Sequence, residues 1–217
     1  ISLRQLMLFG MSAYGIEDGI KAARAAITVM LFKLEGQLIK THPEYEMDDR
    51  LLLEQIENMR NIGVEKSMFP TVDPQNPYEL TEEENTILRK LHRQFVTGQR
   101  LRKHIQFLYD KGSMYNVYNG NLIYHGCVPV DKNGAFDKLC IDGEFYHGKA
   151  LLDKCEQKAR AAYEDNPDKD DVDFMWFLWG GEKSPLCGRK LKTFEREYVG
   201  DKELCKEESN PYYSKYY

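Results

Sequence analysis

The residue of this sequence best suited to chemistry is a histidine at the end of an apolar segment. His125 lies within Asn121–Pro129, and Gly126 follows it directly. A neutral imidazole can bind a divalent metal ion through one ring nitrogen while the other donates to a neighbouring acceptor. Glycine beside it lets a ligand or another backbone approach closely. The pattern therefore indicates a metal ligand, although a histidine after an apolar strand is more often a hydrogen-bonded structural residue.

A second segment with groups capable of chemistry is Gly180–Arg189. It contains Lys183 and Ser184, and Arg196 follows shortly after it. Backbone N–H groups, a hydroxyl, an ammonium and a guanidinium all bind phosphate, the guanidinium through paired contacts. The same composition is also typical of a solvent-exposed connector. The residues alone leave both interpretations open.

Two β-hairpins are expected to position the first segment. Two dipeptides that favour two-residue hairpin turns each separate a pair of short β-type segments. In chain order the segments and turns are Met114–Tyr118, Asn119-Gly120, the strand that ends at His125, Phe136–Ile141, Asp142-Gly143 and Glu144–Tyr146. Apolar and aromatic residues bounded by turn formers are typical of a buried strand, so the strand before His125 is expected to be buried.

The rest of the chain is predicted to be mainly helical. Apolar residues recur at three- and four-residue steps in several segments, and Thr81 with Glu84 forms a capping box. A stretch with three prolines, Phe69–Leu80, is expected to be a turn-rich connection. The expected helices are Ile16–Lys40, one from about Asp48 to Met59, one from Thr81, one ending at Lys111, one from about Lys149 to Tyr163, and Val172–Trp179.

Composition excludes several classes of protein. Lysine and arginine total 30 against 35 aspartates and glutamates, and the basic residues are scattered, so no nucleic-acid partner is expected. No apolar run approaches the roughly 20 residues that cross a bilayer, so no membrane partner is expected either. The five cysteines are odd in number and show no Cys-x-x-Cys pair. They are typical of reduced thiols in a cytoplasmic protein.

Longer words of the sequence resemble one enzyme family. They are LFKLEGQLIKTHPEYEMDDRLLL (31–53), FPTVDPQNPYELTEEE (69–84), HIQFLYDKGSMYNVYNGNLIYHGCVPV (104–130) and FMWFLWGGEKSPLCGRKLKTFEREYV (174–199). Over residues 27–213 the chain resembles class 3 fructose-1,6-bisphosphatases. Its apolar strand followed by His-Gly and a nearby proline also resembles the single-histidine motif of the calcineurin-like metallophosphatase superfamily.

The resemblance implies metal-dependent hydrolysis of the 1-phosphate of fructose 1,6-bisphosphate, a step of gluconeogenesis. Two divalent ions, with manganese the expected metal, would clamp the phosphate and activate a bound water. His125 matches a position that holds one of these ions. Lys183, Ser184 and Arg196 are candidates for contacts with substrate phosphates. No catalytic residue is assigned within the chain.

The fold implied is mixed α/β with helices dominant. Residues 1–112 are expected to form a helical insertion, and 113–217 part of a calcineurin-like α/β domain whose sheet includes the two hairpins. Four further ligand motifs of the superfamily, among them Asp-x-His and Gly-Asn-His, are absent from the sequence. We therefore expect an internal piece of a longer enzyme, inactive when isolated.

Two other functions stay open. A phosphoprotein phosphatase of the same superfamily would share the His-Gly-x-x-Pro pattern. Alternatively, the segment could be a non-catalytic interaction or oligomerisation module, which the absence of the other ligand motifs favours. The sequence also leaves open whether the protein is a homo-oligomer.

Overall fold

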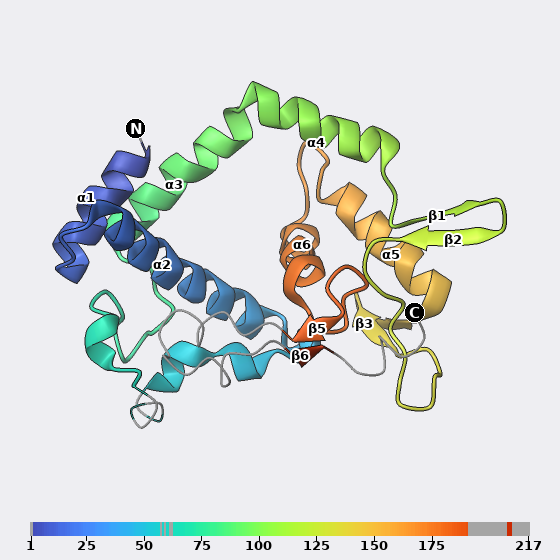
Figure 1. The fold of residues 1–217 in the computed structure, drawn as a ribbon, viewed down its shortest axis with the longest axis horizontal. Coiled ribbons are helices and arrows are strands. Elements are labelled where there is room, and N and C mark those ends of the chain that lie inside the picture. The colour runs from blue at the N-terminus through green and yellow to red at the C-terminus, as the bar shows by residue number, and fades with distance from the viewer. Residues whose placement is uncertain (1, 57, 59, 61–62, 191–207, 210–217) are drawn as a thin grey trace. The chain divides into compact units, whose positions relative to one another are not determined.

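A computed structural model of the chain describes residues 2–56, 58, 60, 63–190 and 208–209 (Figure 1). Six α-helices and three two-stranded antiparallel sheets occur in this part of the chain, which confirms the predicted mixed α/β fold with helices dominant. The chain divides into two compact units. Of the described residues, one unit contains 2–43 and those within 47–105, and the other contains 44–46, 106–190 and 208–209. The assignment of 1–112 and 113–217 to two domains of a complete enzyme stays a prediction.

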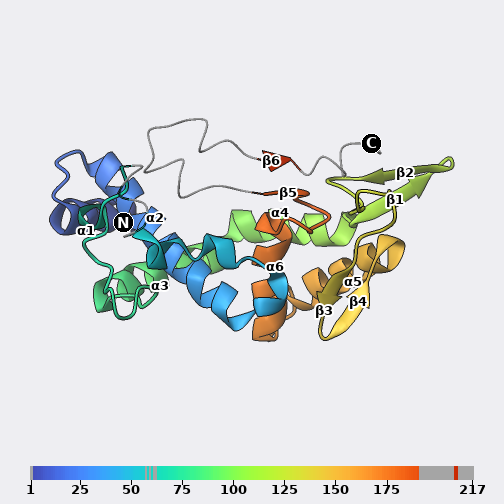
Figure 2. The same ribbon diagram turned by 90° about the horizontal axis from the view of Figure 1, so that it is seen from below.

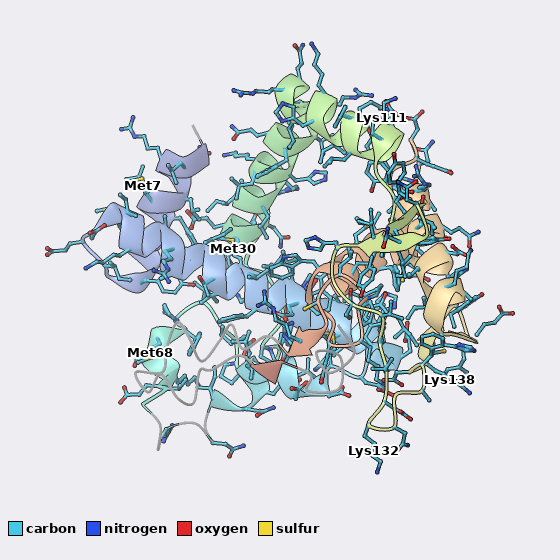
Figure 3. All side chains as sticks on the ribbon, turned by 45° about the vertical axis from the view of Figure 1, so that its right-hand side comes forward. Met7, Met30, Met68, Lys111, Lys132 and Lys138 are labelled. Carbon is cyan, nitrogen blue, oxygen red and sulfur yellow. The ribbon has the colours of Figure 1, made fainter. Side chains whose placement is uncertain are left out.

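The first unit is built on two closely packed helices, α1 (Ser2–Tyr14) and α2 (Gly19–Thr41). Gly10 permits the close approach, because a Cβ there would lie 2.3 Å from the carbonyl oxygen of Ala22. The Asp18 carboxylate caps α2 by accepting from two of its first N–H groups. The predicted helix Ile16–Lys40 is thus confirmed. The hydrophobic core cluster of the unit contains Leu6, Phe9, Ala23, Ala26, Met30 and Ile87. Figure 3 labels Met30 on α2.

The capping box at Thr81 is also confirmed. The Glu84 N–H donates to Thr81 Oγ1 at 3.2 Å, and the Thr81 N–H donates to Glu84 Oε2 at 2.8 Å. Helix α3 (Glu82–Thr97) begins there and α4 (Gln99–Lys111), which ends at Lys111 as predicted, follows after Gly98. The Phe69–Leu80 connection contains neither α-helix nor strand.

A buried ionic network joins α2 to α3 within this unit. Lys33 and Glu84 are fully buried, and Lys33 Nζ donates to Glu84 Oε2 at 2.7 Å. The same ammonium donates to the carbonyl oxygen of Thr71 at 2.7 Å, and the Thr71 hydroxyl donates to Glu84 Oε1 at 2.7 Å. Each charge therefore has several partners inside the unit, as buried charges require.

The predicted helix from Asp48 to Met59 is wrong over its described residues. The chain forms short 3₁₀ turns instead, η2 (Asp48–Arg50) and η3 (Leu52–Glu54), and no side chain caps the first of them. Leu52 and Leu53 are adjacent and both buried. Neighbouring side chains of an α-helix point about 100° apart because it has 3.6 residues per turn. Tight turns that pack against α2 bury these neighbours, where a surface helix would bury only one face.

The second unit contains the two predicted hairpins. Strand β1 (Tyr115–Tyr118) pairs with β2 (Asn121–Tyr124), and β3 (Leu139–Ile141) pairs with β4 (Glu144–Tyr146). Both turns have positive φ at their two central residues, which are 51° and 75° at Asn119-Gly120 and 53° and 81° at Asp142-Gly143. This is the backbone of the two-residue turn that the dipeptides predicted. Lys132 lies at the tip of the loop between β2 and β3 (Figure 3).

The expectation that β2 is a buried strand is wrong. Leu122 is 49% exposed and Ile123, on the opposite face of the strand, is 55% exposed. Their partners on β1, Val117 opposite Leu122 and Asn116 opposite Ile123, are also exposed. The apolar composition predicts the strand correctly, but burial depends on neighbouring elements. No third strand pairs with this hairpin in the described residues.

Two helices complete the second unit, α5 (Gly148–Ala161) and α6 (Lys169–Gly180), which confirms both predicted helices. The start of β1 lies against α5 (Figures 1 and 2), where the Met114 N–H donates to Glu156 Oε2 at 3.1 Å. Strand β5 (Arg189–Lys190) pairs with β6 (Glu208–Ser209). None of the described helices is both long and apolar enough to cross a bilayer.

Candidate functional site

His125 follows β2 directly, as the sequence predicted, and its side chain is exposed. Among the described residues it belongs to no group of three or more histidine, cysteine or carboxylate side chains close enough to share a metal ion. The turn therefore presents one imidazole to solvent. A single such ligand is one corner of a metal site and does not hold an ion by itself.

The backbone after His125 contacts the loop that contains Lys183 and Ser184. A Cβ at Gly126 would lie 2.2 Å from the carbonyl oxygen of Pro185, so only glycine permits this approach. The next residue makes the contact a hydrogen bond, because the Cys127 N–H donates to the same Pro185 oxygen at 2.8 Å. The structure thus brings together the two segments that the sequence singled out. Of the two close neighbours expected at Gly126, a ligand or another backbone, the structure shows a backbone, that of Pro185.

Cys127 is a buried residue of this contact that sequence reasoning missed. Its Sγ lies 3.6 Å from the carbonyl oxygen of Ser184, 57 residues further along the chain. Burial, with a smaller contribution from the nearby Cys187, raises the pKa of the Cys127 thiol to about 12. The resting thiol is therefore protonated at neutral pH, which does not suit it to be the nucleophile of a hydrolytic reaction. No local signal could have identified this contact, because it joins residues distant in sequence.

Ser184 is fully buried, and its hydroxyl makes two internal hydrogen bonds. Oγ donates to the carbonyl oxygen of Leu178 near the end of α6 at 2.6 Å, and it accepts from the Leu186 N–H at 3.1 Å. The hydroxyl thus satisfies a carbonyl that the helix end would leave unpaired. A substrate would reach Ser184 Oγ only after both bonds were broken. The loop centre is thereby fixed to α6 and is not a fully solvated connector.

Lys183 is the partly exposed cation of the loop. Its Nζ donates to Glu46 Oε2 at 2.8 Å. Burial disfavours the charged form, but the hydrogen bond and charge of Glu46, with smaller effects of Asp137 and Glu182, outweigh it and leave the pKa of Lys183 above its ordinary value. The ammonium therefore carries its full charge at neutral pH. Because the Glu46 carboxylate is 69% exposed, an incoming phosphate can compete with it for the ammonium.

Arg196, the third candidate for a phosphate contact, lies outside the described residues. Arg189 lies within them and begins β5. An exposed imidazole and a charged ammonium thus lie on two segments that are joined by a backbone hydrogen bond. Such groups can contribute a metal ligand and an anion contact. They contain no nucleophile with a general base beside it, so they cannot complete a hydrolytic reaction alone.

Sequence comparisons identify the relatives of this chain. A family profile described as Firmicute fructose-1,6-bisphosphatase matches residues 12–216. The class 3 fructose-1,6-bisphosphatase of Clostridium novyi (strain NT) is 44% identical over 207 residues, which cover 89% of this chain and 31% of that protein. The enzyme of the same name from Ligilactobacillus salivarius (strain UCC118) is 46% identical over 199 residues, which cover 87% and 31%.

A third relative, the class 3 fructose-1,6-bisphosphatase of Clostridium botulinum (strain Loch Maree / Type A3), is 44% identical over 87% of this chain and 30% of its own length. The chain thus spans about a third of the length of these curated relatives. No solved structure is significantly similar to it.

Proposed function

Because the chain belongs to the Firmicute fructose-1,6-bisphosphatase family, we propose that it forms part of an enzyme that hydrolyses the 1-phosphate of fructose 1,6-bisphosphate. The products would be fructose 6-phosphate and phosphate, and the reaction a step of gluconeogenesis. The observation that carries this proposal is the continuous match of 12–216 to the family, together with 44% identity to enzymes of that name. His125, Lys183, Ser184 and Arg196 all lie inside the matched region.

We propose that His125 contributes one ligand to a metal centre whose other ligands lie in the remaining two-thirds of the family's length. Its exposed position after β2 supports this, because the imidazole is open to groups from outside the described residues. Two divalent ions, with manganese the expected metal, would clamp the phosphate and lower the pKa of a bound water. The β1–β2 and β3–β4 hairpins would then belong to a calcineurin-like sheet.

Lys183 is proposed to bind the substrate phosphate remote from the reacting one. Its charge and its weak hold on an exposed carboxylate support this role. Arg196 is proposed for the same phosphate, and Ser184 is better placed to fix the loop that carries Lys183 than to touch substrate. Loss of a charge-assisted hydrogen bond costs about 1.5–3 kcal/mol, which is roughly ten- to hundred-fold in kcat/KM.

The test of this role compares two substrates in a chain of the relatives' full length. For Lys183→Ala and Arg196→Ala, kcat/KM should fall about ten- to hundred-fold on fructose 1,6-bisphosphate. It should fall much less on an activated monoester that lacks the second phosphate. Equal losses on both substrates, accompanied by a lower melting temperature, would show that the side chain is structural.

The decisive experiment for the metal ligand is His125→Ala in the same full-length chain. We expect bisphosphatase activity to fall by several orders of magnitude and the bound metal measured by elemental analysis to decrease, while circular dichroism stays unchanged. His147→Ala is the matched control, since His147 is also an exposed histidine that precedes glycine after a hairpin strand. Near-normal activity and metal content in His125→Ala would return His125 to a structural role.

The isolated 217-residue chain is expected to show no turnover with added manganese, because one imidazole cannot hold two ions. A panel of sugar bisphosphates and phosphopeptides would separate this proposal from a phosphoprotein phosphatase. Turnover by the isolated chain would show that the remaining ligands lie within it. A cytoplasmic location stays a prediction, and whether the protein is a homo-oligomer stays open.

A further inference from the structure

Two cysteines from the two contacting segments meet at one carbonyl oxygen. Cys127 Sγ lies 3.6 Å from the oxygen of Ser184, and the Cys187 N–H donates to the same oxygen at 3.1 Å. Cys127 follows the turn of His125, and Cys187 lies within the loop of Lys183. The hydrogen bond from the Cys127 N–H to Pro185 fixes the separation of the two backbones. The two residues are therefore held as neighbours by backbone contacts.

The two thiols differ in access to solvent. Cys127 is 6% exposed, whereas Cys187 is only partly buried and its Sγ makes one weak contact, 3.3 Å from the oxygen of Arg189. A dissolved oxidant would thus reach Cys187 first, and the buried Cys127 is its neighbour. A partly exposed cysteine beside a second, resolving cysteine is the arrangement of redox-sensing pairs.

We propose that Cys127 and Cys187 form a reversible disulfide when the protein meets a peroxide. Hydrogen peroxide transfers one oxygen to the Cys187 sulfur, giving a sulfenic acid and water. The Cys127 sulfur then attacks the Cys187 sulfur, the S–O bond breaks, and the hydroxide that leaves takes up the thiol proton as water. In total, two thiols and one peroxide yield one disulfide and two waters. A dithiol reductant reverses the step by thiol–disulfide exchange.

The cross-link would tie the His125 turn covalently to the Lys183 loop. To form it, Cys127 Sγ must leave the Ser184 oxygen and Cys187 Sγ must leave the Arg189 oxygen. We expect closure of the bond to shift the backbone that carries the proposed metal ligand and the proposed phosphate contact. A misplacement of about 1 Å at a reacting centre costs on the order of a hundred-fold in rate. This effect on catalysis rests on the proposed function, whereas formation of the disulfide does not.

The test is peptide mapping of the purified protein after exposure to hydrogen peroxide and alkylation of the remaining thiols. We expect loss of two of the five thiols and a peptide pair joined through Cys127 and Cys187, which dithiothreitol separates again. Cys187→Ser should abolish the cross-link, and Cys140→Ser, a partly buried cysteine outside the contact, should leave it unchanged. Formation of sulfinic acid at Cys187 without a cross-link, or a bond from Cys187 to another cysteine, would overturn the proposal.

Activity is measured separately in a chain of the relatives' full length. Oxidation should lower kcat by about ten- to hundred-fold in the wild type, reduction should restore it, and Cys187→Ser should resist. A cross-link that forms without changing the activity of an active enzyme would overturn the regulatory role and leave the disulfide assigned. A protein with no bisphosphatase activity before oxidation would contradict the proposed function instead.

Discussion

Charged side chains have opposite roles in the Lys33–Glu84 network of the first unit and in the candidate site of the second unit. In the first unit, Lys33 and Glu84 are fully buried, and both of these charges have partners within the unit. In the second unit, the groups fit for chemistry lie toward solvent, with His125 exposed and Lys183 paired only to an exposed carboxylate. The groups that support the candidate site, Cys127 and Ser184, are buried.

This difference separates residues that stabilise the fold from residues available to a ligand. A satisfied buried network holds its unit together and has no group left for a substrate. An exposed imidazole and an exposed ion pair contribute little to stability and are open to contacts from outside. The charged residues in the network are therefore expected to control folding, and those at the candidate site to control activity.

The largest expected effect on stability is that of replacing Lys33. Lys33→Met would leave the Glu84 carboxylate buried without its cation, which costs about 3–5 kcal/mol of unfolding free energy. Urea denaturation of the variant measures the change. The double variant Lys33→Met/Glu84→Met should recover much of the loss, since it removes both charges. Lys149→Met is the surface control, because Lys149 pairs with Asp153 at an exposed site. An unchanged stability in Lys33→Met would break the distinction between the two regions.

A second buried ion pair in the first unit predicts a pH dependence. Burial raises the pKa of Glu35 to about 7 from 4.5, although the adjacent Arg50 guanidinium acts in the opposite direction. Between these values the folded chain keeps a proton that the unfolded chain releases. The unfolding free energy should therefore fall as pH rises from 4.5 to about 7, by up to about 1.4 kcal/mol per pH unit.

The measurement compares wild type with Glu35→Gln by denaturation at several pH values across this window. The variant cannot ionise, so the difference between the two curves isolates Glu35 from the other carboxylates. A difference that is flat with pH, or that favours the wild type increasingly as pH rises, would contradict a raised pKa.

A smaller effect is expected at the support of the candidate site. Ser184→Ala removes a buried hydroxyl and leaves the Leu178 carbonyl and the Leu186 N–H without this partner. The expected loss is about 1–3 kcal/mol of unfolding free energy. Ser67→Ala is the matched control, because Ser67 is exposed and its hydroxyl donates to the nearby Glu65 carboxylate. If Ser184→Ala lowers catalysis without lowering stability, Ser184 belongs with the ligand-binding residues and the comparison must be redrawn.

The smallest expected change is in the stability of Lys183→Met. The ion pair joins the partly exposed Lys183 to the exposed Glu46 carboxylate, so its loss should change the unfolding free energy by less than about 1 kcal/mol. Thermal melting of the variant beside Glu46→Gln checks this. A loss as large as that of Lys33→Met would place Lys183 among the structural charges and weaken its assignment to substrate phosphate.

The sequence by itself determined the elements whose signals are local. The Asn119-Gly120 and Asp142-Gly143 turns adopt positive φ because these residues tolerate a left-handed backbone that others avoid. Thr81 and Glu84 cap α3 because both groups needed for the capping box lie within four residues. The family, too, was recognisable from contiguous words of the sequence. None of these inferences needs a contact between distant residues.

Only the tertiary structure decided which segments are buried and which groups meet. Leu122 and Ile123 are as apolar as the residues of a buried strand. They are nevertheless exposed, because no described element covers them. Leu52 and Leu53 form a tight turn where periodicity predicted a helix, because packing against α2 outweighs a weak local preference. The contact of Gly126 and Cys127 with Pro185 joins residues nearly 60 positions apart. A local pattern cannot encode such a contact, since it depends on how the whole unit folds.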